Sequence, residues 1–171
     1  MREGLTEVVF ILDRSGSMAG LESDTIGGFN GMVTKQKDEE GEALLSCVIF
    51  DDTSEVIYDR VNISKVKPMT KKQYYVRGCT ALLDAVGHAI KRINAVHKSL
   101  PDDQRPGKTM FVITTDGMEN ASHVFSSDEV KKMIKHEEEK YGWEFIFLGA
   151  DIDVAREAES LGIRSERAMK F

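Results

Sequence analysis

The chain has 171 residues, of which 41% are hydrophobic and 30% are charged, a balance that excludes a disordered or fibrous protein. This length predicts a single domain over residues 1–171, with enough core to fold without disulfide or zinc staples. The net charge of −6 argues against a nucleic-acid partner, because no basic excess is present to neutralise phosphates.

Neither a membrane span nor an export signal is expected. Apolar runs such as 8–12 fall far short of the roughly 20 residues that a bilayer requires. The first five residues lack the charged and then apolar pattern of a leader. Cys47 and Cys79 have no metal-ligand spacing, so we expect two free thiols in a reducing compartment. The sequence therefore predicts a cytoplasmic protein with no membrane partner.

The first half of the chain predicts three strands and one helix. Residues 8–12 form an apolar run that is typical of a buried strand, and residues 26–33 carry apolar side chains at helical spacing. Residues 44–50 and 56–58 predict two further strands. Because only residues 51–54 separate these two strands, we expect them to form an antiparallel hairpin at one edge of the sheet.

The second half alternates helices with strands. Apolar residues at helical spacing predict a helix over 82–96, and Ser126 with Glu129 forms a capping-box pattern that opens another. The remaining expected elements are strands over 110–113 and 145–148, a helix over 152–161 that closes on Gly162, and a sixth strand beginning in 168–171. This order predicts an α/β fold: a Rossmann-like, doubly wound, mostly parallel sheet with one antiparallel edge strand and helices on both faces.

Oxygen-bearing side chains follow two of the expected strands and precede a helix. Asp13, Ser15 and Ser17 come directly after the first strand, and Asp116 follows the strand over 110–113. Thr80 stands before the helix over 82–96. If the first and fourth strands are neighbours where the strand order reverses, Asp13 faces Asp116 and Thr80 enters from a third loop. Hard oxygen ligands of this kind favour Mg²⁺ or Mn²⁺ over zinc.

The run 8–18 resembles the opening of a von Willebrand factor type A (VWA) domain, and 114–117 resembles the Thr-Asp-Gly turn of that family. The metal-ion-dependent adhesion site of the family, or MIDAS, has the form Asp-x-Ser-x-Ser, followed by a Thr and an Asp. The resemblance implies a metal site built from Asp13, Ser15, Ser17, Thr80 and Asp116. It extends from Thr6 to about Leu161, and the final strand and helix of the family are expected to be incomplete.

The resemblance implies a divalent-metal-dependent protein-binding module for adhesion or interaction. Two carboxylates leave a Mg²⁺ or Mn²⁺ ion short of one anionic ligand, and in the family a partner's Glu or Asp carboxylate commonly completes the shell. The expected partner is thus a protein that supplies such a carboxylate, and no catalytic residue or organic cofactor is expected.

Two alternatives stay open. A metal-dependent phosphotransfer enzyme, such as a haloacid-dehalogenase-like phosphatase, needs a second acid two residues after its nucleophilic aspartate, and a lysine that holds phosphate. Here Ser15 stands two residues after Asp13, and 114–117 contains no lysine, so an enzyme is not expected. The second alternative is a scaffold whose metal ion only fixes the loops.

Other polar residues have simpler interpretations. The alternative role for Ser17 is a cap on the first helix. The remaining expectations are a hairpin turn at Asp51-Asp52, a small buried Cys79 in a tight loop, a loop histidine at His123 and a solvated helix end at 137–139.

Overall fold

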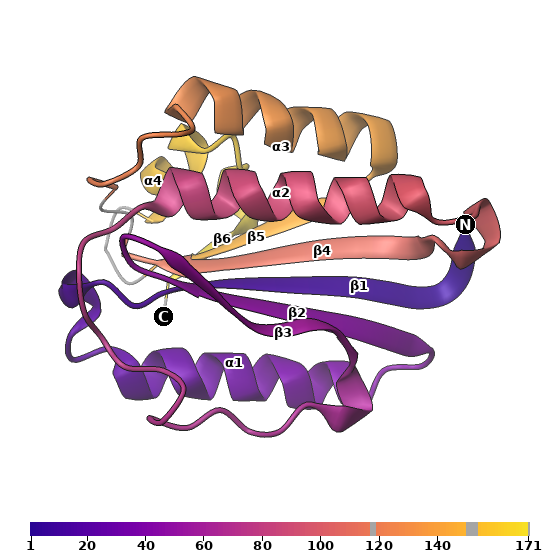
Figure 1. Cartoon of the computed structure of the whole chain (residues 1–171), viewed down its shortest axis with the longest axis horizontal. Helices are drawn as coiled ribbons and strands as arrows, with labels where there is room; N and C mark the ends of the chain where they lie inside the picture. The colour runs from indigo at the N-terminus through magenta and orange to yellow at the C-terminus, as the bar shows by residue number, and fades with distance from the viewer. Residues whose placement is uncertain (117–118, 150–153, 171) are drawn as a thin grey trace.

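The computed structural model describes residues 1–116, 119–149 and 154–170, and Figure 1 shows the whole chain. In the described part, six strands form one sheet in the order β3-β2-β1-β4-β5-β6. All neighbouring pairs are parallel except β2 and β3, which are antiparallel. The strands are β1 (Arg2–Asp13), β2 (Glu42–Phe50), β3 (Ser54–Asn62), β4 (Pro106–Thr115), β5 (Glu144–Gly149) and β6 (Ala168–Lys170). The predicted α/β fold, with its antiparallel edge strand, is confirmed.

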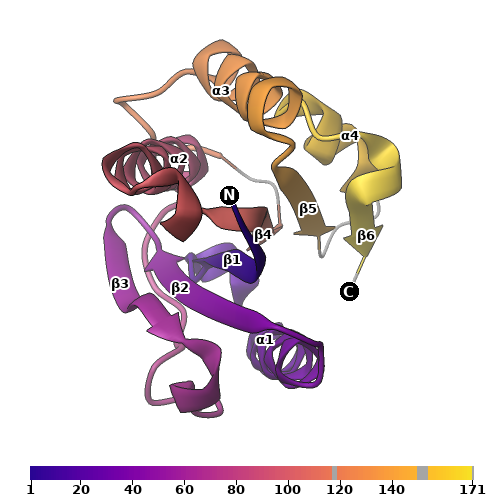
Figure 2. The ribbon, with the colours of Figure 1, turned by 90° about the vertical axis from the view of Figure 1, so that its right-hand side faces the viewer.

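Helices cover both faces of this sheet (Figure 2). Helix α1 (Glu22–Lys37) lies on one face, and α2 (Leu82–Ser99), α3 (Ser127–Tyr141) and α4 (Val154–Ser160) lie on the other. A hydrophobic core lies on each face of the sheet, and alternate residues of β1 pack into one or the other. Val9 and Ile11 pack with α2 and α3, whereas Phe10 packs with α1. A strand whose side chains are buried in both directions reads as a continuous apolar run, which explains the pattern of the first strand.

The helix boundaries follow local sequence signals in α3. The Ser126 side chain accepts a hydrogen bond from the backbone N–H of Glu129, whose carboxylate accepts from the backbone N–H of Ser126. At the other end, Gly142 adopts a left-handed conformation with φ of 68°. The predicted capping box is therefore confirmed. The helix expected over 152–161 corresponds to α4, and residues 152–153 of that range lie outside the described residues.

One alternative and two local expectations are wrong. Ser17 does not cap α1, because it lies in the 3-10 turn η1 (Gly16–Met18) and α1 begins only at Glu22. Cys79 is exposed, because the loop turns the next residue, Thr80, inward instead. Glu137 is buried, because it continues the inward stripe of α3 and accepts a hydrogen bond from the Asn94 amide, 2.7 Å away.

Candidate functional site

The carboxyl ends of β1 and β4 lie at the point where the strand order reverses. From β1 the chain continues to β2 on one side, and from β4 it continues to β5 on the other. Loops that leave such neighbouring strands diverge, and the crevice between them is where open α/β sheets bind ligands. In Figure 1 the carboxyl ends of β1 and β4 are at the left, where the loop after β1 and the loop before α2 lie.

Asp13 joins the ends of these two strands. It is the last residue of β1, and it is fully buried. Its Oδ1 accepts a hydrogen bond from the backbone N–H of Ser15 at 2.7 Å, and its Oδ2 accepts from the hydroxyl of Thr115, the last residue of β4, also at 2.7 Å. The carboxylate is thus held at the reversal point by both strands.

The loop after β1 brings two hydroxyls together. The Oγ atoms of Ser15 and Ser17 are 3.0 Å apart; Ser15 is buried and Ser17 is exposed. The backbone N–H of Gly16, between them, donates to the carbonyl of Gly78 at 3.0 Å. Gly78 has φ of +73°, and a Cβ there would lie 2.6 Å from Oδ1 of Asp52. A glycine is therefore required where the two loops meet.

Thr80 ties the loop before α2 to the segment after β4. It is buried, its backbone N–H donates to the Asn120 side-chain oxygen at 2.8 Å, and its carbonyl accepts from the N–H groups of Asn120 and Ala121 at 3.0 Å each. Asp116 directly follows β4 and is half-buried, and Gly117 lies outside the described residues. We call Asp13, Ser15, Ser17, Thr80 and Asp116 the rim.

The carboxylates of the rim repel each other. Burial raises the pKa of Asp13, and the negative charge of Asp116 raises it further, while hydrogen bonds from Ser15 and Thr115 oppose the shift. A buried carboxyl beside a second acid is stabilised in its charged form by a nearby cation. The charge of Asp116, which follows β4, therefore acts on Asp13 at the end of β1.

The rim holds few charged groups. No cluster of three or more His, Cys, Asp or Glu side chains that could hold a metal is present among the described residues. The rim offers instead two carboxylates and three neutral hydroxyls, all hard oxygen donors. This donor set fits Mg²⁺ or Mn²⁺, because each Asp13 oxygen keeps acceptor capacity beyond the hydrogen bond that it already receives.

An ionic cluster behind the rim was missed at the sequence level. The Arg14 side chain is buried, with its Nε 3.4 Å from Oδ2 of Asp51 in an ion pair that lacks hydrogen-bond alignment. Arg77 donates to the same Asp51 oxygen at 2.7 Å, and Arg14 also pairs with Glu55 at 3.1 Å. Burial raises the pKa of Asp51, but hydrogen bonds from Thr53 and Arg77 and the charges of both arginines bring it below its ordinary value.

This cluster corrects the interpretation of Asp51-Asp52 as a hairpin turn alone. Asp51 does form the turn, since its Oδ1 accepts from the backbone N–H of Thr53 at 2.9 Å, but it also anchors Arg14 and Arg77. The exposed ring of Tyr75 lies 5.4 Å from the Arg14 guanidinium and 5.9 Å from that of Arg77. The only sequence signal was an arginine directly after Asp13, which has no specific meaning without the fold.

Two further residues complete the surroundings of the rim. The Tyr74 hydroxyl donates a hydrogen bond to the Asp13 backbone carbonyl, and burial raises the pKa of this tyrosine, so it remains a neutral donor. The ring of His123 is exposed, and its backbone N–H donates to Asp84 at 3.0 Å. This geometry agrees with the interpretation of His123 as a loop histidine.

The fold and the rim define a doubly wound α/β protein whose polar loops lie together at the carboxyl ends of the strands. No family model matches the chain, and no curated protein matches it. Proximal thread matrix protein 1 from the mussel byssus is similar in structure, with a TM-score of 0.62 at 16% identity over 98% of this chain and 41% of that one.

Two bacterial structures are also similar. An aerotolerance-related membrane protein from Bacteroides fragilis gives a TM-score of 0.50 at 18% identity, over 84% of this chain and 67% of that one. BatB from Bacteroides thetaiotaomicron gives 0.51 at 17% identity, over 84% and 66%. The chain thus spans less than half of the mussel protein and about two thirds of the bacterial chains. At these identities the likeness establishes the α/β fold. No described helix has both the length and the apolar character needed to cross a bilayer.

Proposed function

We propose that the chain is a VWA-type domain that binds a protein partner through a divalent metal ion at the rim. The observation that carries the proposal is the position of Asp13, which is held by Ser15 on one side and by Thr115 of the neighbouring strand on the other. The α/β fold that the chain shares with BatB supports the fold part of the proposal.

In this proposal Asp13, Ser15, Ser17, Thr80 and Asp116 hold Mg²⁺, with Mn²⁺ as the alternative ion. The two carboxylates balance the charge of the cation, and the three hydroxyls add donors without charge. A bound ion would supply a Lewis-acid position that accepts a Glu or Asp carboxylate from the partner. The exposed Tyr75 and Arg77 flank this position, because the Arg77 backbone N–H donates to the Arg14 carbonyl at 2.7 Å.

The proposal includes no catalysis. The residue two positions after Asp13 is Ser15 and not an acid, and its hydroxyl contacts that of Ser17 at 3.0 Å. A phosphotransfer site needs an acid at that position and a cation that holds phosphate. Two cations beside the loop after β1, Arg14 and Arg77, form ion pairs with Asp51.

The test is capture of a partner by the immobilised chain in Mg²⁺, in EDTA, and in EDTA followed by excess Mg²⁺. We expect a bound protein that is lost in EDTA, restored by Mg²⁺, and absent with Asp13→Ala but present with Asp103→Ala, an exposed acid at the far end of the sheet. Moderate NaCl should have little effect, because a direct ion–carboxylate contact is far shorter than the Debye length of about 10 Å at 0.1 M salt.

The identified partner then provides the decisive variant. Changing one of its Glu or Asp residues to Gln or Asn should reduce binding about as much as EDTA does. A complex that survives EDTA unchanged would mean that the ion only fixes the loops and that the partner docks elsewhere.

A further inference from the structure

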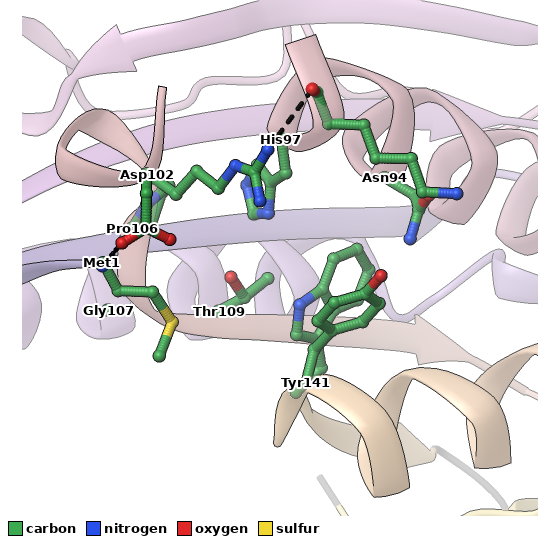
Figure 3. Close-up of a pocket in the computed structure, with 11 residues that line it drawn as sticks. Met1, Asn94, His97, Asp102, Pro106, Gly107, Thr109 and Tyr141 are labelled. Carbon is green, nitrogen blue, oxygen red and sulfur yellow. Dashed lines mark hydrogen bonds and ion pairs between the residues drawn. The ribbon is translucent and has the colours of Figure 1, made fainter. Parts of the chain in front are cut away.

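A cavity lies at the end of the sheet opposite the rim, and Figure 3 shows the residues that line it. Its volume is about 220 Å³, and it opens between the end of α2, the start of β4 and the end of α3. Thr109 lies on its floor, with Asn94 and His97 above and Tyr141 at one side. Thr109 lies six residue steps before Thr115, which adjoins the rim, and this is about 20 Å of strand. We call this hollow the Trp143 cavity.

Two buried polar side chains in its lining lack partners. Trp143 is 5% exposed and Thr109 is 3% exposed. Among the described residues, neither the indole N–H of Trp143 nor the hydroxyl of Thr109 makes a hydrogen bond, and neither atom is fully enclosed by protein. Both groups border the cavity, so they are available as donors to a bound group that accepts hydrogen bonds.

The charged side chains around the cavity favour an anion. The Lys98 ammonium has no ion-pair partner among the described residues, and Arg105 lies on the same side, where its Nε donates to the Leu100 carbonyl at 2.9 Å. The acid in the lining, Asp102, is paired with the amino group of Met1 at 2.8 Å. The lining thus carries two basic side chains, Lys98 and Arg105, against one paired acid, and the charge of Lys98 also acts on the buried Glu137.

The aromatic walls favour a flat apolar body. Trp143 stacks on Phe111 with ring centroids 5.4 Å apart and an interplanar angle of 17°, and His97 meets it edge-on at 5.5 Å. His97 is itself fixed by the fully buried Glu7, 2.9 Å away. These contacts hold the indole in place without a ligand. A cavity of about 150 Å³ accommodates benzene, so about 220 Å³ has room for one substituted ring.

We propose that the Trp143 cavity binds a small single-ring aromatic carboxylate. Its ring lies against Trp143 and Tyr141, and its carboxylate accepts hydrogen bonds from Thr109 and the Trp143 indole and faces Lys98. This site is separate from the rim, so neither EDTA nor Asp13→Ala affects it.

Trp143 is the single tryptophan of the chain, so its indole N–H gives one signal in a ¹H–¹⁵N correlation spectrum. The probes are phenylacetate and its neutral counterpart phenylacetamide. We expect phenylacetate to shift the indole signal in a saturable way, and phenylacetamide to bind about tenfold more weakly or worse, because it lacks the charge that Lys98 recognises.

Three variants locate the interaction. Lys98→Gln should weaken phenylacetate binding about tenfold, and Thr109→Val, which keeps the side-chain shape, should weaken it about two- to tenfold. Lys135→Gln is the matched control, because Lys135 is an exposed lysine of α3 outside the cavity, and it should change nothing. The proposal is overturned by an indole signal that does not move, by equal affinity for the two probes, or by equal affinity of phenylacetate for wild type and Lys98→Gln.

Discussion

Two buried aspartates lie in opposite electrostatic surroundings. Burial raises the pKa of Asp13 and its neighbour Asp116 adds to the effect, whereas in Asp84 the cost of burial is outweighed by hydrogen bonds. The Asp84 Oδ1 accepts from the backbone N–H groups of Val124 and Phe125 at 3.0 and 2.9 Å, and its Oδ2 accepts from that of His123 at 3.0 Å. Asp84 thus joins the segment before α3 to α2, whereas the surroundings of Asp13 disfavour its charged form.

Replacing Asp84 tests its structural role. Asp84→Asn should lower the free energy of unfolding by about 1–3 kcal/mol near neutral pH, because the amide cannot accept all three backbone hydrogen bonds. The pKa of Asp84 is lowered by folding, so its contribution is present above the unfolded pKa of about 3.9 and is lost as the pH falls through the folded value.

Urea unfolding across this pH range measures the effect. The gap between wild type and Asp84→Asn should narrow on acidification, while Asp103→Asn, at an exposed position, should stay near wild type throughout. A gap that is constant with pH would contradict the assignment of the stabilisation to the charged carboxylate.

The elements of the fold were predictable where a local pattern sufficed. Each apolar run became a strand, and the long continuous runs belong to β1, β2 and β4, whose side chains are buried in both directions. The antiparallel edge followed from the short connection at 51–54, and α3 from its capping box. The buried Glu137 was also readable in principle, because it follows Val130 and Ile134 at helical spacing on the inward face of α3.

The rest depended on contacts between distant segments. Arg14 is buried because Asp51 and Glu55, some forty residues away, lie beside it once β1 and β2 pair. The exposure of Cys79 follows from a turn fixed by Gly78 and Asp52, whose carboxylate accepts the Cys79 backbone N–H. The order of the rim residues was visible in the sequence, but the link from Asp13 to Thr115 required the neighbouring positions of β1 and β4.

Glycine substitutions distinguish two kinds of glycine. Gly27 lies inside α1, and a Cβ at this position would meet no atom within 4 Å, so Gly27→Ala should raise the free energy of unfolding by about 0.5–1 kcal/mol. Gly78→Ala should lower it by about 1–2 kcal/mol or more, because its φ is positive and the Cβ would clash with Asp52. Chemical denaturation measures both; effects of the same sign would contradict the loop geometry at Gly78.

The two proposed binding sites are separated by the length of the sheet. Because β1 and β4 are parallel, the polar loops of the rim lie together at the carboxyl ends of the strands. The Trp143 cavity lies at the opposite end, where β4 begins. The net charge of −6 gives no long-range attraction for an acidic partner. A metal ion at the rim would provide the local attraction that the chain as a whole lacks.

A binding module should not turn over phosphate esters. We expect no hydrolysis of generic phosphate esters or nucleotides by the chain in Mg²⁺, because the position two residues after Asp13 holds Ser15 where a phosphotransfer enzyme needs a second acid. A phosphate-release assay measures this. Activity that disappears with Asp13→Asn would replace the binding module by a phosphotransfer enzyme.

Calorimetric titration of Mg²⁺ tests the rim most directly. The chain should bind one ion, and Asp13→Ala and Asp116→Ala should each weaken binding by at least about tenfold, because each removes one of the two charges that face the cation. Asp103→Ala, at the other end of the sheet, should bind as wild type does, and all variants should keep a native far-UV circular dichroism spectrum. Equal Mg²⁺ affinity in wild type, Asp13→Ala and Asp116→Ala would contradict the metal site.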